Sequence, residues 1–216
     1  FTWFLWRFIP RKELKSEPTQ PITADSGIPF SLAIFSARMQ NEFNKPVLAH
    51  IGFDLAGNYS IAQRINEMAS IPLSALQEVL WPKLYSHENP LSRLIASGAF
   101  MLIIAGMTSG ALWLIAPAIP LLLGPDFAAT TDVMRGLAWL PILQVLRSLI
   151  NFQIINKNYL KLLGWTYLIG ALTSIAGVYT LVPIYGLIAA ISITYATEAV
   201  MIVILLAGLY MGKNSE

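Results

Sequence analysis

Two long stretches of the chain carry no charged side chain, over residues 94–125 and 162–197. A helix that crosses a bilayer needs about 20 predominantly apolar residues, so the second stretch is too long for one straight span. Its middle contains Val182-Pro183-Ile184-Tyr185-Gly186, where proline cannot continue a regular helix and glycine favours a turn. We therefore predict two helices here, over about 160–182 and 186–210.

The first uncharged stretch ends at another predicted break, Leu123-Gly124-Pro125-Asp126. Residues 129–155 then form a further predicted helix, which ends before Asn156-Lys157-Asn158. Together with the helix that begins near residue 94 and the two later ones, this pattern predicts four membrane spans in the C-terminal part of the chain.

Two earlier segments, 28–43 and 55–80, mix apolar with polar and charged residues. On a helical wheel the second segment has two faces. Its polar half holds Ser60, Gln63, Arg64, Asn66, Glu67, Ser74, Gln77 and Glu78, and its apolar half holds Leu55, Ile61, Ile65, Met68, Leu73, Leu76 and Val79. Asn58 is the main exception, and Pro72 predicts a kink. Such a helix either lies on the membrane surface or crosses it with its polar half against a water-filled cavity.

The basic residues of the connecting segments favour a crossing helix, because cytoplasmic loops are enriched in Lys and Arg. If 28–43 and 55–80 both cross, the connections on one side hold nine basic residues and those on the other side only Lys45. The nine are Arg7, Arg11, Lys12, Lys15, Lys83, Arg93, Lys157, Lys161 and Lys213. We therefore predict an all-α bundle of about six transmembrane helices with a cytoplasmic C-terminus.

The composition agrees with a membrane protein and narrows the possible functions. Of the 216 residues 56% are hydrophobic and only 12% are charged, whereas soluble domains carry about 25% charged residues. The net charge of +2, without a long basic run, argues against nucleic-acid binding. Cysteine is absent and the two histidines are far apart, so disulfides, thiol chemistry, a zinc site and any other metal or cofactor are not predicted.

No phosphate-binding loop, zinc-protease helix, nucleophile elbow or dinucleotide turn occurs in the sequence. Asp126 and Asp132 could be imagined as the acids of a membrane transferase, but no histidine is near them. We interpret them as solvated residues of a loop and a helix start. The chain is therefore not expected to be an enzyme.

Charged residues inside helices are the main candidates for a binding site, because charge within a membrane faces water or the bundle interior. Arg64 and Glu67, and likewise Arg38 and Glu42, are spaced to pair along one helix face. An arginine fork in a dry cavity suits a phosphate or pyrophosphate. We expect Arg64, Glu67, Arg38 and Asn58 among the substrate-binding residues. The alternative is that the arginines only neutralise neighbouring acids, or that Arg38 reaches the membrane interface.

Two further charges lie in the later helices. Arg147 has Gln144 and Asn151 on its own helix face and is a third candidate for binding phosphate. Glu198 stands alone in the last helix, one turn after Thr194. It could carry a coupling proton or cation, or it could be a buried acid bonded to another helix.

Four stretches, taken in order, resemble motifs of a known family. Residues 56–65 (AGNYSIAQRI) with Ile71-Pro72 are similar to G-x-Y-s-x-A-x-R-i … P, and residues 122–127 (LLGPDF) to l-l-G-p-x-F. Residues 135–141 (RGLAWLP) resemble l-r-x-L-a-x-l, and residues 184–190 (IYGLIAA) resemble x-y-G-l-x-G-A-a, with alanine where the second glycine is usual. These are motifs of the polysaccharide flippases in the multidrug, oligosaccharidyl-lipid and polysaccharide exporter superfamily.

The resemblance implies a transporter of two six-helix lobes around a central cavity, in the bacterial inner (plasma) membrane. Residues 1–10 would end the last helix of an N-terminal lobe, 11–26 would be the cytoplasmic linker, 27–212 the C-terminal lobe and 213–216 the tail. The opening FTWFLWRFIP, which lacks the basic start and cleavage site of a signal peptide, fits this division.

The implied substrate is an undecaprenyl-diphosphate-linked oligosaccharide, such as a repeat unit of O-antigen, capsule or exopolysaccharide, moved by alternating access. Its partners would be this anionic lipid-linked sugar, the N-terminal lobe and the bilayer. By motif position only Arg64 carries over as a residue that attracts the diphosphate head; Arg147 and Arg38 are candidates by their place in helices. The alternatives are a multidrug or cation exporter, an integral-membrane transferase and a structural membrane subunit.

Overall fold

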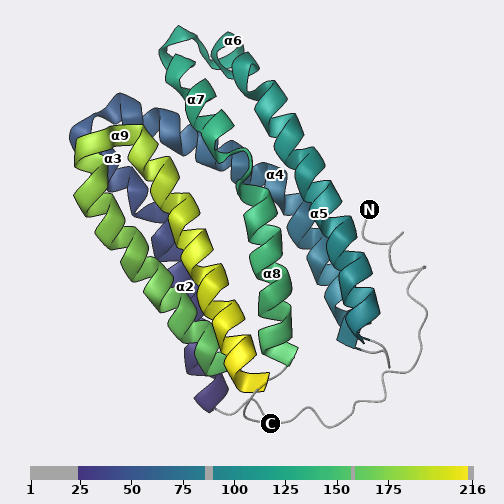
Figure 1. The fold of residues 1–216 in the computed structure, drawn as a ribbon. Coiled ribbons are helices and arrows are strands. Elements are labelled where there is room, and N and C mark those ends of the chain that lie inside the picture. Colours follow the sequence, from purple (N-terminus) through teal and green to yellow (C-terminus); the bar gives the residue numbers. More distant parts are fainter. Residues whose placement is uncertain (1–23, 86–89, 157–158, 214–216) are drawn as a thin grey trace.

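The computed structural model of the chain describes residues 24–85, 90–156 and 159–213, which form helices and contain no strand (Figure 1). The α-helices are α2 (Ala24–Glu42), α3 (Asn44–Ile51), α4 (Phe53–Tyr85), α5 (Pro90–Ile115), α6 (Ile119–Leu123), α7 (Ala128–Leu137), α8 (Leu140–Asn156) and α9 (Leu160–Lys213). Short 3₁₀ turns at Ala116–Ala118 and Pro125–Phe127 flank α6. The predicted helix end at 1–10, most of the predicted linker 11–26 and most of the tail 213–216 lie outside the described residues.

Three helical segments among the described residues are long and apolar enough to cross a membrane: Leu94–Leu123, Pro125–Ile155 and Leu160–Met211. The last has 52 residues, more than one straight span requires. The predicted segments 28–43 and 55–80 are also helical, as α2 and most of α4. They are not among the three apolar segments. The protein is thus a helical membrane protein, and the prediction of six crossings goes further than these three spans.

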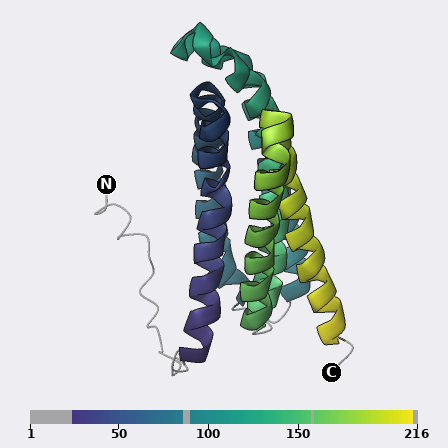
Figure 2. The same ribbon diagram turned by 90° about the vertical axis from the view of Figure 1, so that its left-hand side faces the viewer.

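The longest helix, α9, is a hairpin of two arms that bend at Gly186. Its φ of 58° and ψ of −131° are not helical, and they lie inside the break predicted at 182–186. A Cβ placed on Gly170 would be 2.8 Å from Met201 Sδ, and one on Gly177 would be 3.2 Å from Ile193 Cγ1. These facing positions show that the two arms run antiparallel and in close contact, as Figure 2 also shows. The prediction of two helices is therefore confirmed.

The span predicted over 129–155 is found within the segment Pro125–Ile155, but it is not one continuous helix, because a turn at Ala138 and Trp139 separates α7 from α8. Pro141 follows this break. Because proline has no N–H group, it cannot donate the helical hydrogen bond to the carbonyl one turn earlier. Tyr195 of α9 donates a hydrogen bond to the nearby Gly136 carbonyl at 2.8 Å. The predicted break before Pro125 is confirmed, since Gly124 has a φ of 108°.

The helices form one bundle with two ends (Figure 1). The turn from α3 into α4, the α6 region and the bend of α9 lie at one end, whereas the start of α5, the end of α8 and both ends of α9 lie at the other. Near the first end, buried side chains of α3, α4, α7 and α9 form the largest apolar cluster, which includes Leu48, Tyr59, Leu137 and Val182. Farther along, apolar clusters join α4 to α5 and α8, and α8 to α9. Polar side chains occupy the space between these clusters.

Candidate functional site

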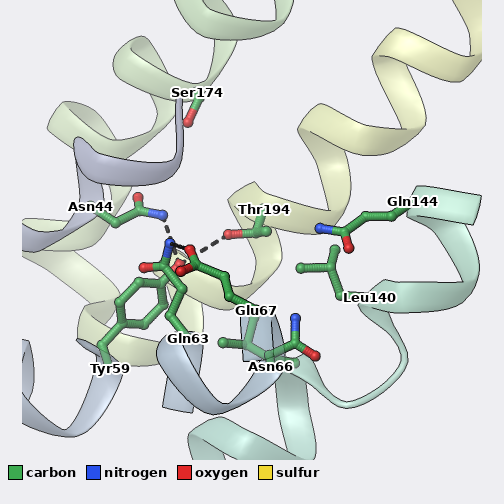
Figure 3. A pocket seen from close by; sticks show the side chains of 10 residues that line it. Asn44, Tyr59, Gln63, Asn66, Glu67, Leu140, Gln144, Ser174 and Thr194 are labelled. Carbon is green, nitrogen blue, oxygen red and sulfur yellow. Dashed lines mark hydrogen bonds between the residues drawn. The ribbon is translucent and has the colours of Figure 1, made fainter. Parts of the chain in front are cut away.

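Two polar cavities lie one after the other along α4, between it and helices α8 and α9. The first, here called the tyrosine cavity, has as its polar lining Asn44, Tyr59, Gln63, Asn66, Glu67, Gln144, Ser174 and Thr194 (Figure 3). The second, the arginine cavity, has as its main polar lining Ser74, Gln77, Arg147, Ser148, Asn151 and Tyr167. Gln144 of α8 borders both cavities, and the α4 residues that line them extend from Tyr59 to Trp81, about two thirds of the helix.

The tyrosine cavity is built around a buried hydroxyl group. Asn44 Nδ2 of α3 donates a hydrogen bond to Tyr59 Oη at 2.8 Å, and Tyr59 Oη lies 3.2 Å from Thr194 Oγ1 of α9 (Figure 3). The cavity volume is only about 30 Å³. A water molecule needs about 10–15 Å³ measured in this way, so the cavity has room for water but not for a sugar.

The arginine cavity is much larger, at about 330 Å³, which is within the usual size range of small-molecule sites. Ser148 Oγ donates to Gln77 Oε1 at 3.0 Å across the α4–α8 interface. Asn151 Nδ2 donates to Tyr167 Oη at 2.9 Å, which joins α8 to the first arm of α9. The walls of this cavity thus combine amide, hydroxyl and guanidinium groups, which suit a polar ligand carrying hydroxyl and anionic groups.

The charged centre of the arginine cavity is an ion pair between α8 and α9. Arg147 Nε lies 3.2 Å from Glu198 Oε2, and the two side chains are 17% and 4% exposed. The Arg147 guanidinium carbon also lies 5.2 Å from the centre of the Tyr167 ring, a cation–π distance. The second arm of α9 supplies one more contact, because Arg147 Nη1 points at Met201 Sδ at 3.6 Å. Arg147 is therefore held in place while it borders the cavity.

Arg147 and Glu198 are the two predicted site residues that the fold brings into contact. The sequence indicates each separately. Glu198 is a buried acid bonded to another helix, and its role in carrying a proton or cation stays a prediction. Because the two residues are far apart in sequence, their spacing does not predict the ion pair, which forms because the second arm of α9 packs against α8.

The other predicted site residues occupy different environments. Arg64 and Arg38 are exposed and make no ion pair within the described residues. The proposed partner of Arg38, Glu42, instead pairs with Lys45 at 2.7 Å. Glu67, the proposed partner of Arg64, borders the tyrosine cavity and accepts a hydrogen bond from Gln63 Nε2 at 2.9 Å.

Asn58 is buried, and it forms a contact between helices. Its Nδ2 donates to the carbonyl of Asp54 at 2.7 Å, and its Oδ1 accepts a hydrogen bond from Thr130 of α7 at 2.5 Å. Neither cavity is lined by Asn58. This polar residue on the apolar half of α4 has a partner on the neighbouring helix, which explains why it departs from the two-faced pattern.

Several cavity residues could not be singled out from the sequence. Tyr167 and Ser148 sit in segments whose pattern is simply helical, and Asn44 lies in the predicted connection after 28–43, so none carries a local signal for a site. The signal that was available is the polar half of 55–80: Gln63, Asn66, Ser74 and Gln77 from that half all line the cavities. Among the described residues, no group of His, Asp and Glu could hold a metal ion.

No family model matches this chain, and no curated protein or solved structure matches it either. Functional inference therefore rests on the chemistry of the two cavities and on the resemblance of the sequence motifs.

Proposed function

We propose that this chain is the C-terminal lobe of a flippase that moves undecaprenyl-diphosphate-linked oligosaccharide across the bacterial inner membrane by alternating access. The observation that carries the proposal is the arginine cavity of about 330 Å³, with Arg147, a mostly buried cation of the apolar segment Pro125–Ile155, on its wall. A buried cation inside a membrane bundle is costly and marks a path for a ligand or an ion.

The lining chemistry fits the two parts of such a head group. The guanidinium of Arg147 can donate two parallel hydrogen bonds to phosphate oxygens. Gln77, Ser148 and Asn151 carry the amide and hydroxyl groups that bind sugar hydroxyls, and Trp81 adds an apolar surface next to them. We infer that the diphosphate lies at Arg147 and that the first sugars extend along α4.

Six crossings are part of this proposal. The chain passes between the two ends of the bundle as α2 with α3, as α4, as α5, as α7 with α8, and as the two arms of α9 (Figure 1). The end that holds the start of α5 and both ends of α9 carries Arg93, Lys161 and Lys213, whereas the bend of α9 and the turn at Gly124 have no basic residue. This distribution supports a cytoplasmic location for the basic end.

A multidrug or cation exporter is less well supported. Such a carrier needs a buried acid that can face an organic cation, and Glu198 already faces Arg147 at 3.2 Å. Glu67 is exposed at the rim of a cavity with room only for water. We place the substrate in the anionic class for this reason.

The proposal is tested by replacing Arg147 in the full-length protein and measuring export of the surface glycan. We expect Arg147→Ala to reduce export at least about tenfold, the loss of a charge-assisted contact of roughly 1.4 kcal/mol or more. Arg135 is the matched control, because it is also embedded in a helix but stacks on Trp113, 4.9 Å from the ring centre, away from both cavities. Arg135→Ala should leave export intact.

A second variant separates loss of function from loss of folding. Arg147→Ala leaves Glu198 as a buried charge without a cation, which destabilises a protein by about 3–5 kcal/mol. The double variant Arg147→Ala/Glu198→Gln removes both charges and should recover thermal stability without recovering export. Normal export by the stable double variant would reject Arg147 as the phosphate-binding group.

A further inference from the structure

Arg147 stands between the arginine cavity and a buried carboxylate. Its side chain borders the cavity, and Glu198 lies beside it with its Oε2 3.2 Å from Arg147 Nε. Arg147 Nη1 has only a thioether sulfur, Met201 Sδ, at 3.6 Å, and such a sulfur is a weak acceptor. Since a guanidinium carries five N–H donors, Arg147 keeps donors for a ligand in the cavity.

An anion in the cavity competes with Glu198 for this cation. Two phosphate oxygens can engage the planar fork together through two hydrogen bonds, whereas Glu198 Oε2 lies 3.2 Å from Arg147 Nε and has no hydrogen-bond partner in the described parts of the chain. Once Arg147 turns towards the phosphate, Glu198 becomes a carboxylate that is 4% exposed and has no cation. A buried carboxylate charge without a cation is strongly unfavourable, and Glu198 loses this charge when its carboxylate binds a proton.

We propose that Glu198 is a proton-binding site that fills when a diphosphate group occupies Arg147, so that the anion and the proton bind together. The proton comes from the surrounding water and is held on the Glu198 carboxylate. The diphosphate diester brings two negative charges and the proton brings one positive charge, so the net charge among the helices falls by one instead of two. This inference rests on the proposed function, which supplies the anion, and it adds the ion to which binding is linked.

The surroundings of Glu198 leave Arg147 as its cationic partner. Arg147 is the one charged residue of α8, and Tyr167 faces it from the first arm of α9. On α4, Tyr59 and Glu67 border the tyrosine cavity at Thr194, one helical turn from Glu198. Among the described side chains, Glu198 makes no ion pair besides the one with Arg147. The other charged side chains described on the helices that pack against α9 are Arg38, Glu42, Lys45, His50, Asp54, Arg64, Glu78, Asp132 and Arg135.

The test counts protons during anion binding to the purified full-length protein. The probe is dimethyl diphosphate with one methyl group on each phosphate, because this diester does not itself change protonation near neutral pH. Binding heats are measured at one pH in Mes and in Tris, whose ionisation enthalpies differ, and the difference gives the protons bound per anion. The wild-type protein should take up close to one proton, and its affinity for the diester should therefore rise as the pH falls.

Two variants make the outcome specific. Glu198→Gln should bind the diester with no proton uptake, with an affinity that no longer depends on pH and is roughly tenfold higher because the competing carboxylate is gone. Arg147→Ala/Glu198→Gln should not bind it. Anion binding by the wild type without proton uptake, or uptake that persists in Glu198→Gln, overturns this inference but leaves the anion site standing. Failure of the wild type to bind any diester overturns the anion site itself.

Discussion

Thr130 of α7 donates a hydrogen bond of 2.5 Å to Asn58 of α4, and both side chains are buried. The contact joins two helices that are far apart in sequence, near the end of the bundle where α3 turns into α4. Asn58 Nδ2 also donates to the carbonyl of Asp54, one turn earlier in α4, so both the nitrogen and the oxygen of its side-chain amide are hydrogen-bonded. This relationship assigns Asn58 to the framework of the bundle.

Replacing Asn58 should therefore reduce stability without a direct effect on the cavities. Asn58→Ala leaves the Thr130 hydroxyl buried without its acceptor, and the expected loss in free energy of unfolding is about 1–3 kcal/mol. Thermal unfolding in detergent measures it. Asn58→Ala/Thr130→Val removes both polar partners and should recover part of the loss. Equal stability of wild type and Asn58→Ala would show that the bond contributes nothing to folding.

Glycine in α9 should be required where its two arms touch. A Cβ on Gly208 would collide with the side chain of Leu162, so Gly208→Ala should destabilise the hairpin by about 1–3 kcal/mol through overpacking. Gly110 of α5 is the control, since a Cβ there meets no atom within 4 Å. Gly110→Ala should be neutral or slightly stabilising, because alanine has the higher helix propensity.

A compensating change makes the same prediction sharper. Leu162→Ala opens space opposite Gly208, so the double variant Gly208→Ala/Leu162→Ala should be less destabilised than the two separate losses added together. Simple additivity of the two losses in thermal unfolding would contradict close packing of the arms at this point.

Cysteine labelling can decide whether α4 crosses the membrane, and the chain has no native cysteine to interfere. Ser74→Cys, which borders the arginine cavity, should react with a membrane-impermeant thiol reagent. Met68→Cys should stay unreactive in membranes although Met68 is 67% exposed, because its exposure is to lipid. After extraction into denaturant both positions should react equally. Rapid reaction of both in intact membranes would place α4 on the membrane surface.

Much of the fold follows from local chemistry. The uncharged runs predict the apolar helices, and Gly186 and Gly124 mark breaks because their positive φ values are the conformations that glycine tolerates best. The two-faced pattern of 55–80 likewise predicts which side of α4 meets the cavities, since helical periodicity fixes which side chains share a face. The break between α7 and α8 was less evident, because a proline near the start of a helix resembles one inside it until the backbone is seen.

For the candidate site, too, the sequence determines one part and the tertiary structure determines another. From its sequence alone, this protein is defined as a helical membrane protein with charges placed inside apolar helices, because hydrophobic length and charge cost depend on short segments. Only the tertiary structure decided that Arg147 and Glu198 form one ion pair beside a cavity, whereas Arg64 and Arg38 stay exposed. Contacts between residues that are distant in sequence depend on how the helices pack against one another, and no local sequence pattern determines that packing.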